Sequence, residues 1–395
     1  MSSQSLGEHI KALRGRLYTQ RELAERAGVS VDLVRKLEQG SRNTASVASL
    51  HRLARALDVS LADLIGRGHL PEQEQSEGVT ALRHAVAGVD DLIGPADGSP
   101  LTAHEAERAD VYVWGAYWSG NHDATVAMLP GVLADLRATV AAAHGADEEV
   151  ARHALARVLW AAGSTLVHLK HLDAAFIATR RAVDLVARGE DPHLAAAVRG
   201  SLAWQLMVAG RYEESAELSL SSASAIEPDG GATLPALSAY GSLVLQAGNA
   251  AARAGKASRA RDLLAEAAEV STRVPDGRND YSTAFGPSQV TMQSADILIN
   301  LGEHGEALRL AGGMPNAGAA LPKIARCRHL TDKALAHVKV GQHGPALDLV
   351  ASATSMAPNW AKHQSLPKSV VRELLHTSPK RSSRLRTLAA QLGVR

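Results

Sequence analysis

The sequence has a single cysteine, Cys327, among its 395 residues, and only 3% of its residues are aromatic. One cysteine excludes an internal disulfide framework and a zinc site built from several cysteines. No apolar run reaches the roughly 18 residues that a membrane-spanning helix needs. The N-terminus also lacks the basic stretch followed by an apolar stretch that marks a secretory signal. A cytoplasmic protein without a membrane partner is therefore expected.

The motifs of common catalytic and nucleotide-binding sites are missing as well: G-x-G-x-x-G, the P-loop, G-x-S-x-G and H-E-x-x-H. His168 and His171 span a predicted helix end, which makes a metal-binding pair improbable. Cys327 and His329 lack a third, orienting group, and this favours an ordinary buried cysteine. The sequence thus predicts no catalytic residue, no metal and no cofactor, and the protein is not expected to be an enzyme.

Charge is distributed unevenly, although Lys and Arg total 42 and Asp and Glu total 41. Residues 1–70 hold 11 basic and 7 acidic side chains, and residues 360–395 hold 8 basic and 1 acidic. The segment between them is acidic, so only the two ends favour a polyanionic partner. For the C-terminal end alone, a solvated helix face explains the charge equally well.

The first 65 residues carry clear signals for starting and stopping short helices. Thr19 and Glu22 form a capping box, and Gly28 ends the helix that follows. Ser30 is a good N-cap for the next helix. Two capped helices joined by a short glycine turn make a helix-turn-helix. Five helices are expected, over residues 6–13, 20–27, 31–39, 47–57 and 60–65.

This region closely resembles the Cro/CI-type (XRE family) DNA-binding domain. Three signatures in register carry the resemblance: TQRELAERAGVS at residues 19–30, LEQG at residues 37–40 and LARALDVS at residues 53–60. The resemblance implies a DNA-binding domain over residues 1–68, whose second motif helix enters the major groove. It places these residues at the DNA: Gln20, Ser30, Val31, Asp32, Arg35, Lys36, Arg42 and Asn43.

The residue types in this set suit different contacts with DNA. Arg35 or Lys36 can donate to guanine O6 and N7, and Val31 can contact a thymine methyl group. Asp32 can accept from a cytosine amine, but it repels phosphate, so its role stays open. Arg42 and Asn43, which follow the second signature, are placed for phosphate contact. Glu38 occupies a family position that we interpret as structural.

Residues 69–100 are rich in glycine, proline and polar side chains, and we expect a linker with one short helix there. Beyond it a turn recurs, at residues 170–172, 210–212, 255–257, 302–304 and 341–343. A small residue stands seven positions before each turn: Gly163, Ala203, Gly248, Ala295 and Ala334. Another stands five positions after each turn start: Ala175, Ser215, Ala260, Ala307 and Ala346. Small residues at these offsets allow two antiparallel helices to pack closely.

This pattern resembles the tetratricopeptide repeat (TPR). The expected fold is therefore all-α, with the five-helix domain followed by an α-solenoid of degenerate helix pairs over residues 101–395, closed by a basic C-terminal cap. In TPR arrays the first helix of each pair lines a concave face. When the positions of the TPR motif are transferred to this sequence, they predict an effector site on the concave face. Its residues are Arg157, Trp160, Trp204, Asn249, Arg253, Gln289, Asp296 and Asn300.

The complete architecture resembles the bacterial RRNPP-type regulators, which sense peptide signals in quorum sensing. The resemblance implies a transcriptional regulator that binds double-stranded operator DNA as a homodimer and associates with the nucleoid when bound. A peptide or a small molecule would act as effector, and the sequence does not separate the two. The alternative is a protein-interaction scaffold that the helix-turn-helix domain tethers to DNA.

Overall fold

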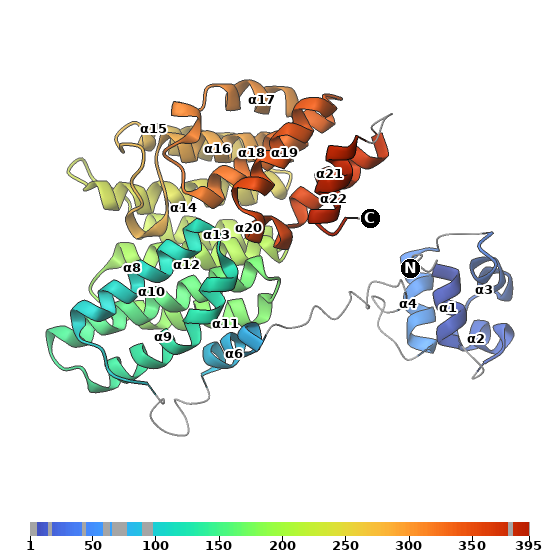
Figure 1. The fold of residues 1–395 in the computed structure, drawn as a ribbon, viewed down its shortest axis with the longest axis horizontal. Helices are drawn as coiled ribbons and strands as arrows, with labels where there is room; N and C mark the ends of the chain where they lie inside the picture. Colours follow the sequence, from blue (N-terminus) through green and yellow to red (C-terminus); the bar gives the residue numbers. More distant parts are fainter. Residues whose placement is uncertain are drawn as a thin grey trace. The chain divides into compact units, whose positions relative to one another are not determined.

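The chain divides into two compact units, Met1–Ser76 and Glu77–Arg395, in the computed structural model (Figure 1). The structure describes residues 6–14, 18–41, 45–57, 64, 77–88, 98–377 and 382–394. Every regular element within these residues is a helix, so the predicted all-α class is confirmed. Each unit has a hydrophobic core of its own.

The described residues of the N-terminal unit form four short helices: α1 (Leu6–Arg14), α2 (Gln20–Ala27), α3 (Val31–Glu38) and α4 (Val47–Ala56). The Thr19 hydroxyl accepts from the Glu22 N–H and the Glu22 carboxylate accepts from the Thr19 N–H, so the predicted capping box is present. Gly28 ends α2 with a left-handed φ of 61°, and the Ser30 hydroxyl caps α3. These local signals fix the angle between α2 and α3.

The core of this unit is small and wholly apolar. It is centred on five side chains without solvent exposure: Ile10, Leu23, Val34, Leu37 and Leu53. Most of the fifth expected helix, 60–65, lies outside the described residues, although Leu64 is described and buried. Val34 and Leu37 anchor one face of α3, which leaves the opposite face to solvent.

Six antiparallel helix pairs form the body of the described C-terminal unit. They are α8 (Ala103–Ser119) with α9 (His122–Ala142), α10 (Ala146–His168) with α11 (Leu172–Val186), α12 (Pro192–Val208) with α13 (Tyr212–Ser224), α14 (Leu234–Arg253) with α15 (Ala257–Ser271), α16 (Pro287–Asn300) with α17 (His304–Gly312), and α18 (Lys323–Lys339) with α19 (His343–Met356). All five predicted turns lie between the two helices of a pair, and α8 with α9 adds a sixth pair.

Shorter helices complete this unit. The segments η1 (Asp280–Ser282) and η2 (Pro315–Gly318) are 3₁₀ helices in the long connections that precede α16 and α18. At the C-terminal end stand α20 (Pro358–His363), α21 (Ser365–Thr377) and α22 (Ser383–Gln391). Helix α21 packs on α18 and α19 and buries Val370, Val371 and Leu374 there.

The small residues around the turns are the positions of closest approach within each pair. All ten are buried. In the second predicted pair the Ser215 hydroxyl donates to the Ala203 carbonyl over 2.7 Å. The small residue after the turn thus contacts the small residue before it directly. At Gly163 an added Cβ would lie 2.1 Å from the Thr179 hydroxyl oxygen. At Gly163 the two helices are too close for a larger side chain.

The short helix expected in the linker is α6 (Glu77–Ala87), and its position differs from that expectation. It packs against α9 and α11, with Leu82 and Val86 fully buried. Helix α6 therefore belongs to the C-terminal unit, and the boundary between the units follows Ser76 rather than extending to residue 100. The glycine and proline pattern gave no information on what the helix contacts.

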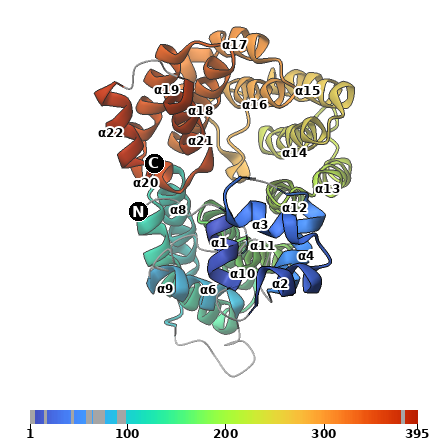
Figure 2. The ribbon, with the colours of Figure 1, turned by 90° about the vertical axis from the view of Figure 1, so that its right-hand side faces the viewer.

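The first and last helix pairs of the C-terminal unit touch, so the array closes into a ring (Figure 2). Helix α18 contacts α8, and α20 contacts α9. Gly120 lies so near this junction that a Cβ there would be 2.8 Å from Ile324 Cγ2. On the outer side Lys362 Nζ pairs with the Asp123 carboxylate at 3.0 Å. We call these contacts the seam.

Three histidines and a tyrosine lie at the seam. The His122 ring is fully buried and stacks on His168 with a centroid distance of 4.9 Å, and His363 approaches it from α20. Tyr117 and Gln364 both hydrogen-bond the His168 ring, at 3.2 and 3.1 Å. The two hydrogen bonds connect the first two helix pairs with the segment that follows α20.

By length and composition, one helix in the described residues, α9, is apolar enough to cross a membrane. Its surroundings account for that composition, because α9 packs against α6, α8, α10 and α20. Leu129, Leu133 and Leu136 on its inner face have no solvent exposure. The helix is part of the packed array.

Two glycines at the same repeat position provide a matched test of close packing. Gly163→Ala should destabilise the protein by about 1–3 kcal/mol, because the new Cβ collides with Thr179, which is buried and held by Gln205 at 2.6 Å. Gly248→Ala meets nothing closer than 3.5 Å and should stabilise it by about 0.5–1 kcal/mol, since alanine favours a helix interior. Denaturant unfolding measures both. Equal effects of the two substitutions would contradict the packing explanation.

Because of the histidines at the seam, we expect the stability of the protein to fall as the pH is lowered. Burial, reinforced by the charges of His168, His363 and Lys362, lowers the pKa of His122 to about 2, and burial lowers the pKa of His168 and His363 to about 4. Below pH 6.5 these three histidines bind protons in the unfolded chain but stay neutral in the folded protein. The free energy of unfolding should therefore decrease from pH 7 to pH 5. His122→Phe should reduce that decrease by about 2 kcal/mol while leaving stability above pH 7 nearly unchanged.

Thermal unfolding monitored by circular dichroism across this pH range measures the effect. A variant with the same pH dependence as the parent protein would show that His122 protonates freely in the folded state.

Candidate DNA interface and effector cavity

The recognition helix α3 presents a row of side chains to solvent. Val31, Asp32, Arg35 and Lys36 are exposed, as is the N-cap Ser30. Their position follows from the helix period, because Val34 and Leu37 occupy the buried face. Arg42 and Asn43, the two remaining residues predicted beyond α3, lie outside the described residues.

Asp32 holds both cations of this exposed face. Its carboxylate accepts from Arg35 Nη2 at 2.6 Å and pairs with Lys36 Nζ at 2.7 Å. The hydrogen bond from Lys36, together with that from Arg35, lowers the pKa of Asp32. The exposed face of α3 therefore carries a net charge of +1 rather than +2, and the Arg35 and Lys36 side chains are both directed toward Asp32.

Gln20, the first residue of α2, and Glu38, the last residue of α3, are hydrogen-bonded to each other. The nearly buried Glu38 carboxylate accepts two hydrogen bonds from Arg14, at 2.7 and 3.0 Å, and one from the Gln20 amide at 2.8 Å. Burial alone would raise the pKa of Glu38, but the bonds from Arg14 and Gln20 outweigh it and lower that pKa. Glu38 thus has the structural role expected of it, and one of the two hydrogens of the Gln20 amide is already used.

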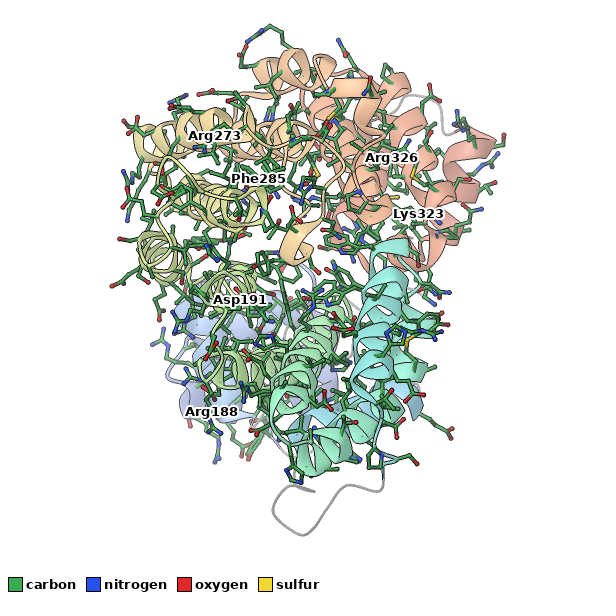
Figure 3. All side chains as sticks on the ribbon, turned by 90° about the vertical axis from the view of Figure 1, so that its left-hand side faces the viewer. Arg188, Asp191, Arg273, Phe285, Lys323 and Arg326 are labelled. Atoms are coloured by element: carbon green, nitrogen blue, oxygen red, sulfur yellow. The ribbon has the colours of Figure 1, made fainter. Side chains whose placement is uncertain are left out.

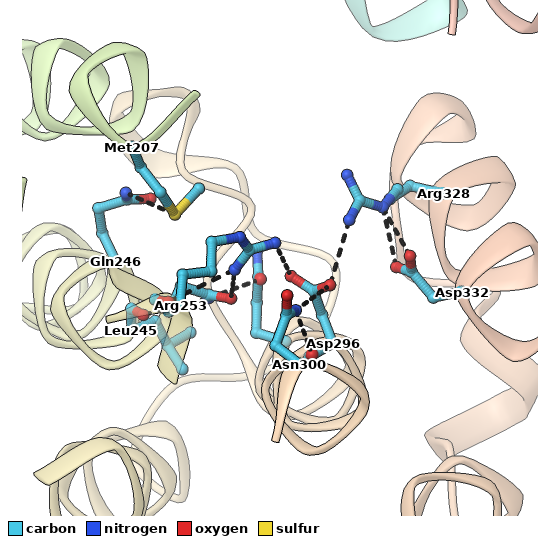
Figure 4. Close-up of polar contacts among 10 residues, drawn as sticks. Met207, Leu245, Gln246, Arg253, Asp296, Asn300, Arg328 and Asp332 are labelled. Carbon is cyan, nitrogen blue, oxygen red and sulfur yellow. Dashed lines mark hydrogen bonds and ion pairs between the residues drawn. The ribbon is translucent and has the colours of Figure 1, made fainter. Parts of the chain in front are cut away.

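The eight residues predicted on the concave face separate into two groups. Asn249, Arg253, Asp296 and Asn300 form the first group, a polar network that connects α14, α16 and α18 (Figure 4). The Asp296 carboxylate lies between Arg253 Nη2 at 2.9 Å and Arg328 Nη2 at 3.1 Å.

Most polar atoms of this network bond to one another. Burial alone would raise the pKa of Asp296, but the charges of Arg328 and Arg253 outweigh it and lower that pKa. Arg328 also bonds the Asp332 carboxylate at 2.8 Å. Contrary to the expectation from the sequence, these side chains hold neighbouring repeats together, and their hydrogen bonds are already made without an effector.

The second group lies at an aromatic cavity of about 200 Å³. Trp160, Trp204 and Gln289 line it, together with Trp114, Tyr117 and Trp118 from α8. Four of the five tryptophans in the sequence therefore meet at one place. Trp114 packs edge-on against Trp160 with ring centroids 4.8 Å apart.

The connection between α15 and α16 closes the cavity from the centre of the ring. Figure 3 shows η1 reaching inward, with Phe285 labelled at its base. Phe285 is buried in the notch left by Gly241, where an added Cβ would be 2.1 Å from the phenyl ring. Tyr281 donates to Asp191 at 3.1 Å, which anchors the loop to the start of α12. Ser282 and Thr283 from this loop line the cavity.

Arg157, the remaining predicted residue, borders the cavity without lining it. Its guanidinium pairs with Asp110 at 2.5 Å, reaches the Ser282 hydroxyl at 3.3 Å and lies 5.9 Å from the centre of the Trp114 ring. Burial raises the pKa of Asp110, although Arg157 opposes that shift. Arg157 therefore supports the loop and a cavity wall.

Trp114, Trp118 and the loop residues are not among the site residues predicted from the sequence. The two tryptophans stand four apart, on one face of a helix, and this spacing was an available signal. The turn at residues 120–122, which follows α8, was a weaker match to the repeat pattern, because Val113 replaces the small residue, and no site residue was predicted from it. The loop has no periodic pattern, and nothing in its sequence indicates that it folds inward.

Comparison with known proteins supports the N-terminal assignment. The helix-turn-helix family profile matches residues 10–64, which confirms the domain predicted from the three signatures. No curated protein sequence matches the chain.

Similar folds occur among solved structures. PlcR of Bacillus thuringiensis, solved with the peptide PapR7 and DNA, is 14% identical over 88% of this chain and 99% of its own, with a TM-score of 0.35. BtubC of P. vanneervenii is 13% identical over 66% of this chain and 96% of its own, with a TM-score of 0.40.

The Asp32 contacts predict a specific effect on DNA binding. Asp32→Ala should release Arg35 and Lys36 toward phosphates, so affinity for random-sequence DNA should rise and fall more steeply with salt. One additional phosphate contact changes the slope of log K against log salt by about 0.9. Fluorescence anisotropy with random duplexes at several salt concentrations measures this slope. A slope equal to that of the parent protein would show that Asp32 does not restrain these cations.

Proposed function

We propose that the protein is a sequence-specific, DNA-binding transcriptional regulator whose operator binding responds to an effector held inside the repeat array. The observation that carries the DNA-binding part is the exposed row on α3: Val31, Asp32, Arg35 and Lys36 stand opposite a buried apolar face. The position of this helix in a helix-turn-helix domain supports the proposal that its N-terminal residues meet base edges.

A homodimer follows from the small reach of one such domain. A single recognition helix meets too few base pairs for useful specificity, and helix-turn-helix proteins commonly join two half-sites by twofold symmetry. The selected operator should therefore be an inverted repeat with half-sites about 34 Å apart. The protein would act in the cytoplasm, at the nucleoid.

The effector part rests on the aromatic cavity. Cavities bounded by aromatic side chains and a few polar groups are typical ligand sites. The alternative function, a protein-interaction scaffold, favours a flat and heavily charged concave face. Within the part of the chain that the structure describes, no residue that lines this cavity carries a charge, and the loop before α16 extends into the middle of the ring. These features favour sensing over scaffolding.

The DNA-binding proposal is tested with the double variant Arg35→Ala/Lys36→Ala. An operator is first selected from random DNA by the parent protein, and gel-shift titration then compares the variants. The double variant should lose about 1–3 kcal/mol for each base contact removed. The control Arg211→Ala/Lys256→Ala removes two exposed cations from the C-terminal unit and should bind like the parent protein. A folded Arg35→Ala/Lys36→Ala protein with parental affinity would refute the assignment of α3.

A further inference from the structure

We propose that the aromatic cavity binds a compact, uncharged, planar ring compound that carries both a carbonyl acceptor and an N–H or O–H donor, as a cyclic amide does. This inference rests on the proposed function for its regulatory meaning, but the binding itself is a property of the cavity. Of the two effector classes that the sequence left open, this inference favours a small molecule over a peptide. Three independent features of the cavity lead to it: its size and walls, its lack of charge, and its unpaired polar atoms.

Size and shape favour a compact ring. The cavity measures about 200 Å³, below the roughly 300–1,000 Å³ of sites for drug-sized ligands. An extended peptide of five residues spans about 17 Å and needs an open channel. Here the seam closes the ring of helices and η1 reaches into its centre. Indole faces and edges from α8, α10 and α12 form the walls, and flat aromatic surfaces pack best against a flat ligand.

The absence of charge at the cavity favours a neutral ligand. Among the described residues that line it, none is Asp, Glu, Lys or Arg. Arg157, which contacts Ser282 and Trp114 of the lining, already pairs with Asp110 at 2.5 Å. A charged ligand would lose its hydration without gaining a counter-ion, which is strongly unfavourable.

Unpaired polar atoms define the hydrogen-bonding pattern of the ligand. The Nε1–H donors of Trp114 and Trp118 are buried and find no acceptor among the residues that the structure describes. The side-chain oxygen of Gln289 is a buried acceptor that finds no donor within the same residues. A buried polar group without a partner costs about 1–3 kcal/mol. A ligand with a carbonyl oxygen for an indole N–H and a donor for Gln289 relieves that cost.

Adjacent C=O and N–H groups on one planar ring are the simplest way to supply both. The tryptophans thus serve two purposes, because the indole rings accommodate a flat ligand and their N–H groups select a carbonyl. Trp114 is 5% exposed, so its N–H has no access to bulk solvent as an alternative partner. The donor–acceptor pair distinguishes the ligand from a plain hydrocarbon of the same shape.

Two probes and their hydrocarbon counterparts test the inference. The full-length protein is titrated with 2-pyridone and 2-quinolone, which are planar lactams, and with benzene and naphthalene. Tryptophan fluorescence and calorimetry measure binding. Each lactam should bind at least about tenfold more tightly than its hydrocarbon, the equivalent of one buried hydrogen bond. Binding should quench the emission of the cavity tryptophans.

Variants locate the site. Trp114→Phe keeps an aromatic wall and removes one N–H, and Gln289→Leu removes the acceptor from a half-buried position. Each should weaken lactam binding by roughly tenfold while leaving hydrocarbon binding nearly unchanged. The matched control is Trp360→Phe, at the one tryptophan outside the cavity, which should bind both probes like the parent protein. Gln289→Leu keeps the test valid if Trp114→Phe fails to fold.

Two results would overturn the inference. Lactams that bind no better than their hydrocarbons would mean that water satisfies the polar atoms of the cavity. Lactam binding that Trp114→Phe and Gln289→Leu leave intact would place the ligand elsewhere. Operator binding is measured separately, with and without 2-quinolone. Lactam binding at the cavity without any effect on DNA supports this inference and counts against the effector part of the proposed function.

Discussion

The close approach of two helices at the small residues around each turn determines the geometry of the whole C-terminal unit. A buried alanine, glycine or serine on each side lets the backbones nearly touch, as the bond from Ser215 to the Ala203 carbonyl shows. Repeating that approach pair after pair fixes the curvature of the array. The curvature in turn brings α18 and α20 against α8 and α9, and only then do the four tryptophans surround a common space.

Polar and aromatic side chains on the inner face of the ring have different tasks. The network around Asp296 joins three successive first helices through charges that are nearly all paired, so it stiffens the far side of the ring. Among the residues that the structure describes, the cavity leaves the indole N–H groups of Trp114 and Trp118 and the side-chain oxygen of Gln289 unpaired, and no charged residue lines it. Asn249 connects the two regions, because it bonds Arg253 on one side and donates to Gln293, a cavity residue, at 2.8 Å on the other. A ligand in the cavity thus lies one hydrogen bond away from the network.

Sequence patterns predicted the parts of this structure that depend on short-range signals. The capping box at Thr19, the glycine at residue 28 and the small residues around each turn act within a few residues, so they can be recognised without knowing the fold. The assignment of Glu38 as structural also agrees with its hydrogen bonds to Arg14 and Gln20. The candidate site was predicted only in part. Whether Asp296 faces a ligand or pairs with Arg253 depends on the distance between α14 and α16, which no local pattern encodes.

Closure of the ring changes how the array is expected to fold. An open solenoid has contacts only between neighbouring repeats, so its ends fray and its stability is close to a sum over repeats. The contact of Asp123 with Asn359 and Lys362 joins residues more than 200 positions apart in the chain. Joining segments so distant costs chain entropy that grows only slowly with the length of the loop, but it slows folding markedly. A closed ring of this kind folds more slowly than an array that assembles repeat by repeat, but it unfolds cooperatively. It also fixes the number of repeats, since adding or removing one pair would leave the ends unable to meet.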